Sequence, residues 1–200
     1  MICLLVRHGK TPGNENGIYL GCKIDESLSD SGREAVSQCR IYNDLLEGRR
    51  LRVFSSPMKR ARETAGILFG EETNIIEEIT EIDFGDFEGK NYQQLNGNED
   101  YQRWIDSGGT VTFPGGESME EYGKRCRSGL DKIINQTADD EVAVVVCHGG
   151  TIMALLCGLT GKNYFDFQIG NLEGYWLEFR TKDGTISDLS YNRITGRSDS

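Results

Sequence analysis

The sequence predicts a layered α/β domain with a mainly parallel sheet, and three observations lead to this fold class. Short apolar runs alternate with helix-start signals over most of the 200 residues, a pattern typical of parallel strands joined by helices. Asp183-Gly184 lies between two strand-like segments near the end of the chain and predicts an antiparallel hairpin. No segment has the composition of a linker, so we expect one domain over residues 1–200.

The first segments predict two strands separated by a loop and a helix. Ile2 to Val6 is a continuous apolar run, which predicts a buried strand. Residues 7–30 are rich in Gly, Asn and Asp and predict a loop. Ser31-x-x-Glu34 is a capping-box pattern, so a helix is expected over about 32–47. Residues 51–55 then predict the second strand.

The middle of the chain alternates in the same way. Ser56-Pro57 has the form of an N-cap followed by the first helical residue, and predicts a helix to about Leu68. Residues 75–79 form a short apolar and acidic run, which predicts a third strand. Residues 92–105 predict a helix, and the Gly-rich residues 108–116 predict a loop.

The last part of the chain has the strongest strand signal. Ser118-x-x-Glu121 is a capping box that predicts a helix to about Ile134. Val142 to Cys147 is uniformly apolar and predicts a buried strand, and Gly149-Gly150 then precedes an apolar helix expected over 151–159. The hairpin strands are expected over 175–180 and 185–189.

Composition restricts the possible partners and the cellular location. Lys plus Arg is 22 and Asp plus Glu is 32, so the formal charge is −10, which disfavours nucleic acid and anionic membranes as partners. No run of 18 apolar residues is present, and the apolar start of the chain is too short for a signal peptide. The six cysteines show no CxxC or other paired metal spacing. We therefore expect free thiols and a cytoplasmic location.

The two histidines of the chain follow the ends of two predicted strands. His8 comes after the first strand and His148 after the strongest one. In open α/β sheets, ligands bind at the carboxyl ends of parallel strands. If the two strands are neighbours, the imidazoles meet in one cleft; the alternative is two unrelated histidines at strand ends.

Four segments, in this order, resemble the motifs of the histidine phosphatase superfamily, which also contains the cofactor-dependent phosphoglycerate mutases. They are Arg7-His8-Gly9-Lys10-Thr11 with Asn14, Ser55-Ser56-Pro57-Met58-Lys59-Arg60-Ala61, Glu81-Ile82-Asp83-Phe84-Gly85-Asp86-Phe87-Glu88-Gly89, and His148-Gly149. Pro114-Gly115-Gly116-Glu117-Ser118 resembles a further segment of the phosphatase branch. The resemblance implies a three-layer αβα sandwich like that of phosphoglycerate mutase.

The resemblance also assigns roles to five residues. It implies that His8 is the nucleophile, and a neutral imidazole is competent for this near pH 7. It implies that Arg7 and Arg60 hold the phosphate, since planar guanidinium groups match its oxygens. His148 is expected to contact the phosphate as well. Glu81 is the expected general acid, with Asp83 as its rival.

Other residues are weaker candidates with a structural alternative. Thr11, Asn14 and Gly149 are expected to bind substrate, although Thr11 could order its own loop and Gly149 could form a strand-to-helix turn. Structural roles are expected for Ser118 and Glu88, and surface positions for Lys59 and Arg62. Glu117 and Arg125 are expected at the cleft rim. Lys10 is expected either at the entrance of the cleft or in solvent. A Cys147–His148 dyad is disfavoured because adjacent strand residues point to opposite faces.

These residues predict a metal-independent phosphomonoester hydrolase that uses a phosphohistidine and needs no cofactor. The substrate is expected to be a small phosphomonoester. The segment Gly89–Gly115 contains only Lys90 and Arg103 as cations, whereas the mutases carry a long insertion there with basic residues. A mutase is therefore the second hypothesis, and a non-catalytic phosphate-binding module is the third.

The segment from Tyr19-Leu20-Gly21 to Leu28-Ser29 resembles the bacterial α-ribazole phosphatases of cobalamin assembly. This resemblance makes α-ribazole 5′-phosphate a candidate substrate. The sequence does not identify the physiological substrate or the oligomeric state.

Overall fold

The apolar runs of the sequence form the centre of a six-stranded sheet with the order β3-β2-β4-β1-β5-β6. The computed structural model describes residues 1–70, 72–182 and 184–196. The strands are β1 (Ile2–Arg7), β2 (Arg50–Ser55), β3 (Asn74–Ile75), β4 (Glu141–Cys147), β5 (Gly174–Lys182) and β6 (Thr185–Ile194).

The sheet is parallel from β3 to β1, and β5 runs antiparallel to β1. The central strand β4 is buried on both faces, as in other parallel sheets covered by helices. Its register with β1 pairs Arg7 with Cys147, so the residues that follow both strands emerge together. The mainly parallel sheet with an antiparallel strand is thus confirmed.

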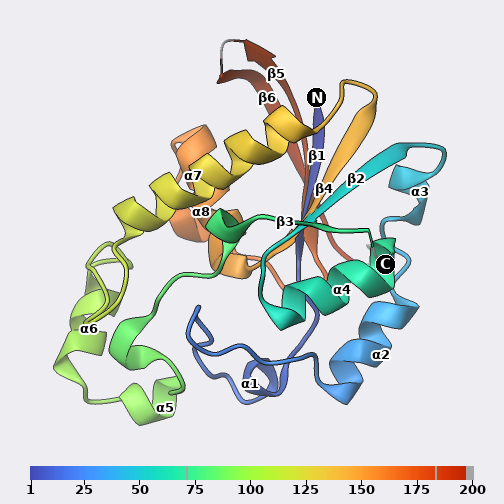
Figure 1. Ribbon diagram of the computed structural model, residues 1–200. Coiled ribbons are helices and arrows are strands. Elements are labelled where there is room, and N and C mark those ends of the chain that lie inside the picture. The colour runs from blue at the N-terminus through green and yellow to red at the C-terminus, as the bar shows by residue number, and fades with distance from the viewer. Residues whose placement is uncertain (71, 183, 197–200) are drawn as a thin grey trace.

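Helices cover both faces of this sheet and complete three layers (Figure 1). One face packs against α4, where Val6 and Val53 meet Ala61 and Ala65. The other face packs against α7 and α8 through a larger apolar cluster. The longer helices are α2 (Asp30–Gln38), α4 (Lys59–Phe69), α6 (Glu99–Asp106), α7 (Met119–Gln136) and α8 (Gly149–Thr160).

Short helical segments gather where β1 ends (Figure 1). They are α1 (Pro12–Glu15), α5 (Tyr92–Leu95) and the 3-10 turns η1 (Glu77–Ile79), η2 (Gly85–Phe87) and η3 (Tyr164–Phe167). A further short helix, α3 (Asn43–Leu46), lies apart from them, beside the start of β2 (Figure 1). Across the described ranges, no helix combines the length and apolar character needed to cross a membrane.

The helix expected over 32–47 was wrong in both its start and its length. Ser29, not Ser31, is the N-cap, and its hydroxyl accepts a hydrogen bond from the Gly32 amide at 3.0 Å. The helix ends at Gln38, because the extended backbone at Cys39 turns the chain so that Tyr42 becomes buried. Burial of one aromatic ring therefore overrides the helical pattern.

Three further boundaries differ from the sequence prediction. Helix α4 begins at Lys59 with Met58 as its N-cap, and the Ser56 hydroxyl instead accepts from the Met58 amide at 3.3 Å and lies 2.7 Å from His148 Nε2. Strand β3 ends at Ile75, and residues 77–79 form a 3-10 turn. The helix expected over 92–105 is two helices, since Asn98 starts a new one by accepting a hydrogen bond from the Tyr101 amide at 2.9 Å.

The loop predicted over residues 7–30 contains one short helix, α1, which begins at Pro12 because Thr11 caps it. The other predictions of secondary structure agree with the structure. Ser118 and Glu121 form the expected capping box at the start of α7. The final hairpin of β5 and β6 is present and is longer than expected. Its predicted turn residue Asp183 lies outside the described residues, so only the two strands test that prediction.

Candidate active site

The two histidines lie side by side at the carboxyl ends of β1 and β4. The backbone amide of His8 donates to the Cys147 carbonyl at 3.0 Å, which fixes the two strand ends together. The ring centroids of His8 and His148 are 5.2 Å apart, and both side chains are buried. We call Arg7, His8, Arg60, Glu81 and His148 the histidine cluster.

His8 is held with one ring nitrogen free of protein partners in the described part of the chain. Its Nδ1 lies 2.7 Å from the Gly9 carbonyl oxygen. A carbonyl only accepts hydrogen bonds, so Nδ1 carries the proton and the lone pair is on Nε2. Burial, followed by the charges of Arg60 and Arg7, holds the pKa of His8 well below its usual range. A neutral imidazole is the nucleophilic form.

His148 is fixed by protein partners at both ring nitrogens. Its Nδ1 accepts from Arg60 Nε at 3.3 Å, and Nε2 lies 2.7 Å from the Ser56 hydroxyl. Burial and the charge of Arg60 hold its pKa well below the usual range. Contact between His148 and a phosphate therefore remains a prediction. Ser56, which sequence reasoning treated as a helix cap, is a part of the site that it missed.

The two arginines of the histidine cluster differ in their free donors. Arg60 is fully buried, and its terminal nitrogens donate to the carbonyls of Ile24, Leu20 and Gly21 at 2.9, 3.3 and 3.2 Å. Arg60 thus anchors the loop that precedes α2. Arg7 donates from Nη1 to the Ile169 carbonyl at 2.6 Å. Its buried Nε has no hydrogen-bond partner among the described residues and remains for an anion.

Glu81 enters the cleft from the segment after η1, and three donors hold its carboxylate. Oε1 accepts from the Tyr122 hydroxyl at 2.6 Å and from the Ile82 amide at 3.0 Å, and Oε2 accepts from the Gly150 amide at 3.2 Å. Asp83 instead forms an ion pair with Lys23 at 2.8 Å. Glu81 lines the cleft and Asp83 does not, so Glu81 is the better placed of the two carboxylates to reach a substrate.

Arg125 and Glu117 support the backbone that carries Glu81. The Arg125 guanidinium donates to the carbonyls of Glu78 and Thr80 at 2.8 and 2.9 Å and pairs with Glu117 at 2.8 Å. It also lies over the Tyr122 ring, 5.0 Å from the ring centroid. Neither Arg125 nor Glu117 lines the cleft. The Tyr122 hydroxyl is a site group that no sequence signal indicated.

Thr11 orders its own loop rather than lining the cleft. It caps α1, and its amide donates to Asn14 Oδ1 at 3.2 Å. The same oxygen accepts from Asn171 Nδ2 at 3.3 Å, and Asn171 also donates to the His8 carbonyl at 2.9 Å. Asn171 comes from the turn before β5 and was missed, since its position depends on β5 pairing with β1.

Gly149 begins α8 directly beside Arg7. A Cβ atom at this position would lie 3.4 Å from Arg7 Nε, so glycine keeps the approach to that donor open. The amides at the start of a helix also favour a bound anion. Gly149 is therefore the expected strand-to-helix residue, and its contact with a bound anion remains a prediction.

The surface and structural expectations agree with the structure. Lys59, Arg62 and Lys10 are exposed. Glu88 accepts from the amides of Phe84 and Lys23, each at 3.2 Å, and so holds the loop between them. One trio of side chains with metal-ligating atoms occurs in residues 1–70, 72–182 and 184–196, namely Cys22, Asp83 and Glu88. It lies outside the cleft, and Lys23 already neutralises Asp83.

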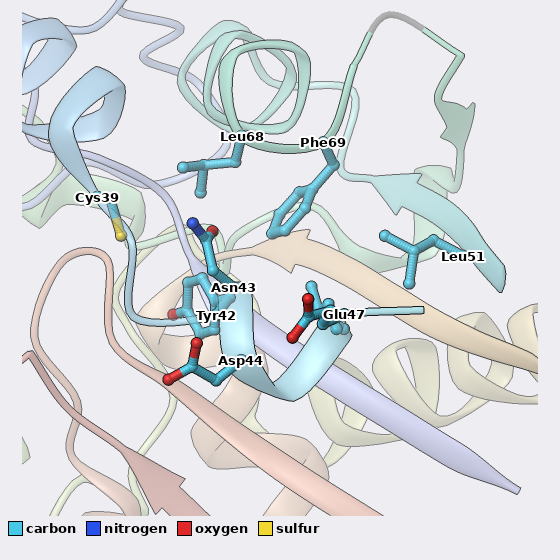
Figure 2. A pocket seen from close by; sticks show the side chains of 9 residues that line it. Cys39, Tyr42, Asn43, Asp44, Glu47, Leu51, Leu68 and Phe69 are labelled. Carbon is cyan, nitrogen blue, oxygen red and sulfur yellow. The ribbon is translucent and has the colours of Figure 1, made fainter. Parts of the chain in front are cut away.

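The cleft beside the histidine cluster has a volume of about 300 Å³, at the lower end for ligand pockets. Arg7, His8, Asn14, Glu81 and Gly149 line it, whereas Arg60, His148 and Thr11 lie behind its wall. A second hollow of about 470 Å³, which we call the α3 hollow, lies between α3 and α4. Figure 2 shows Leu68 and Phe69 on one side of this hollow and Asn43 and Glu47 on the other, with the Asp44 carboxylate directed away from Leu68 and Phe69.

Comparison with known proteins identifies a family model and relatives that are phosphatases. The model of the histidine phosphatase superfamily (branch 1) matches residues 3–192. Phosphoserine phosphatase 1 of Hydrogenobacter thermophilus is 32% identical over 170 residues, which are 82% of this chain and 78% of that protein. Adenosylcobalamin/alpha-ribazole phosphatase of Salmonella typhimurium is 28% identical over 161 residues, 78% of this chain and 77% of that protein.

A solved structure extends the likeness over nearly the whole chain. The phosphoserine phosphatase of Entamoeba histolytica, in complex with 3-phosphoglyceric acid, superposes with a TM-score of 0.76 at 28% identity. The superposition covers 94% of this chain and 95% of that one.

Proposed function

The chain belongs to the histidine phosphatase superfamily and is a phosphatase, and on this premise we propose that it hydrolyses a small phosphomonoester through a phosphohistidine at His8, without a metal. The observation that carries the proposal is the pairing of Nδ1 of His8 with the Gly9 carbonyl at 2.7 Å. It leaves the Nε2 lone pair available, and the buried Nε of Arg7 offers a donor in the same cleft.

The reaction divides into two balanced steps. In the first, Nε2 of His8 attacks phosphorus, the bond to the leaving oxygen breaks, and protonated Glu81 gives its proton to that oxygen. In the second, the Glu81 carboxylate takes a proton from water, the water oxygen attacks phosphorus, and the N–P bond breaks. Inorganic phosphate leaves, and His8 and Glu81 return to their starting forms. Arg7 and the Gly149 amide at the start of α8 hold the phosphoryl charge throughout.

The segment between η2 and α7 supports hydrolysis over mutase activity. A mutase must shield its phosphohistidine from water and hold a carboxylate as well as phosphate. Lys90 donates to the Asp86 carbonyl at 2.6 Å, and Arg103 pairs with Asp100. Neither cation lines the cleft, so neither is placed to hold a substrate carboxylate.

A trapped intermediate tests the mechanism. We expect the chelator-treated enzyme, quenched during turnover of a ³²P-labelled phosphomonoester, to carry acid-labile, base-stable phosphate on His8. His8→Ala should carry none and should release no inorganic phosphate above background. Activity that disappears in EDTA and returns with zinc or magnesium would contradict the proposal, as would a His8→Ala variant that still turns over.

Substrate competition tests hydrolase against mutase. We expect release of phosphate from a small phosphomonoester to be faster than interconversion of 2- and 3-phosphoglycerate, with or without a 2,3-bisphosphoglycerate primer. Isomerisation at about 10 per second, the rate of an ordinary working enzyme, with little free phosphate would establish the mutase alternative. Phosphoserine and α-ribazole 5′-phosphate belong in the panel because relatives are named for them.

A further inference from the structure

Four aromatic side chains line the same cleft as Arg7, His8 and Glu81. We call Tyr19, Phe84, Trp104 and Phe113 the aromatic shelf. Their ring centroids lie 5.3 Å apart for Tyr19 and Phe84, 5.1 Å for Phe84 and Phe113, and 5.2 Å for Trp104 and Phe113. Such spacing is typical of aromatic rings in direct contact.

The aromatic shelf is fixed before any substrate arrives. Tyr101, which lies behind it, stacks on Trp104 with a centroid distance of 6.0 Å and an interplanar angle of 21°. The hydroxyls of Tyr101 and Tyr19 are 2.9 Å apart, which ties α6 to the loop after α1. A rigid surface loses little conformational entropy when a ligand binds to it.

The cleft offers a single guanidinium and no lysine among the described residues that line it. That guanidinium is Arg7, which the proposed mechanism assigns to the phosphoryl group. Cations on nearby segments are engaged with acidic partners: Lys23 with Asp83, Arg103 with Asp100 and Arg125 with Glu117. A second anionic group on the substrate would therefore be desolvated against aromatic rings without a counter-charge, which is unfavourable.

We propose that the alcohol part of the substrate carries a flat, uncharged ring that packs on the aromatic shelf. This inference rests on the proposed phosphatase function and adds the class of substrate. It also separates this chain from the substrates for which some of its relatives are named, because phosphoserine and phosphoglycerate each carry a carboxylate. The aromatic shelf then determines specificity, and the histidine cluster performs the chemistry.

Substrate pairs with matched leaving groups give the most direct test. Ethyl phosphate and 2-phenylethyl phosphate both release a primary alcohol, as do ribose 5-phosphate and a benzimidazole riboside 5′-phosphate. We expect kcat/KM to be at least about tenfold higher for the ring-bearing member of each pair, mainly through a lower KM. Phosphoserine should be no better than ethyl phosphate.

Two variants assign the preference to the aromatic shelf. We call the ratio of kcat/KM between the ring-bearing and the ring-free member of a pair the ring advantage. Trp104→Leu and Phe84→Leu should each reduce the ring advantage by about fivefold or more, whereas Tyr92→Leu should leave it unchanged. Tyr92→Leu is the matched control, since Tyr92 is an aromatic residue that is 63% exposed and lies outside the cleft. Because the comparison of substrates uses the wild-type enzyme, it stands even if a variant fails to fold.

The possible outcomes separate failure of the aromatic shelf proposal from failure of the proposed phosphatase function. If the wild-type enzyme hydrolyses none of these esters and no aryl phosphate, the proposed function fails. If it hydrolyses them but prefers phosphoserine, or treats ring-bearing and ring-free members alike, the aromatic shelf proposal alone is overturned. An unchanged ring advantage in both Leu variants would also overturn it.

Discussion

The histidine cluster and the aromatic shelf both contribute side chains to one cleft, yet they are built in different ways. His8 and His148 directly follow neighbouring strands, and hydrogen bonds to other parts of the protein fix each ring. Trp104 and Phe113 come from α6 and the loop after it, and they are positioned by contacts between rings. The sheet therefore sets the chemistry, while segments outside it set the shape that a substrate meets. Substitutions in the aromatic shelf can change specificity without disturbing the sheet.

The largest effect that separates the two regions is expected from Glu81→Gln. The amide keeps the shape of the side chain but has no proton to give to the leaving oxygen. We expect kcat for alkyl phosphates to fall by about 10² to 10⁴, with a much smaller loss for aryl phosphates of acidic phenols, which need little protonation. The ring advantage should persist, because the aromatic shelf is intact.

Steady-state kinetics across a leaving-group series measures this effect. An equal loss for alkyl and acidic aryl esters would move the acid role away from Glu81, and Asp83→Asn is the next variant to test. Collapse of the ring advantage in Glu81→Gln would show that the two regions do not act independently.

Arg7→Met is expected to have the next largest effect and to change the pH profile. Loss of a charged hydrogen bond to the phosphoryl group should lower kcat/KM by about 10- to 150-fold for every substrate. Arg7 also contributes to the lowered pKa of His8, so its removal should raise that pKa. A larger fraction of His8 is then protonated near pH 6, and the acid limb of kcat/KM should move to higher pH.

The measurement is kcat/KM between pH 5 and 8 for the wild type and the variant, with ethyl phosphate and 2-phenylethyl phosphate. Lys59→Met serves as a matched control, because it removes an exposed cation from the start of α4. An acid limb that stays in place, or moves to lower pH, would contradict the stated electrostatic link between Arg7 and His8.

The histidine cluster could be predicted from the sequence, whereas the aromatic shelf could not. The histidine cluster was predicted because its histidines follow apolar strands and its arginines and Glu81 belong to recognisable motifs. The partners Ser56 and Tyr122 were not predicted, since their hydroxyls reach the site only after helix and sheet have packed. Trp104 belongs to a segment with no motif, and its place in the cleft depends on the break that Asn98 makes between α5 and α6.

Arg60 shows a further limit of prediction from motifs. Its position in the histidine cluster was expected, but its donors bind the carbonyls of the loop at residues 20–24. A motif identifies the residue type at a position, whereas the surrounding loop decides which of its donors stay free. The free donor among the two arginines is on Arg7.

A smaller effect is expected from Tyr122→Phe, which tests support behind the histidine cluster. The hydroxyl lies 2.6 Å from Glu81 Oε1, and its removal leaves the ring in place. We expect kcat for alkyl phosphates to fall by about 5- to 10-fold, the cost of one hydrogen bond of average strength, with KM unchanged. Acidic aryl esters should be nearly unaffected, because Tyr122 acts through Glu81. A loss that is equal for both ester classes would instead indicate a general structural defect.

The smallest effect is expected in the α3 hollow, although its volume exceeds that of the cleft. Asp44→Asn and Glu47→Gln remove its carboxylates, and none of the residues that line the α3 hollow lines the cleft. We expect kcat/KM and the ring advantage to stay within about twofold, the range of ordinary surface substitutions.

A chain of hydrogen bonds connects the α3 hollow to His8, and the same assay detects any effect of the hollow on activity through it. Tyr42, which lines the α3 hollow, donates to the Leu172 carbonyl at 2.8 Å, and the neighbouring Asn171 donates to the His8 carbonyl at 2.9 Å. Leu172 has a positive φ of 61°, so this turn tolerates few alternative conformations. A loss of tenfold or more in Asp44→Asn, matched by Tyr42→Phe, would show that the α3 hollow acts on His8 through this turn. Activity would then depend on three regions, and the simple division between histidine cluster and aromatic shelf would be wrong.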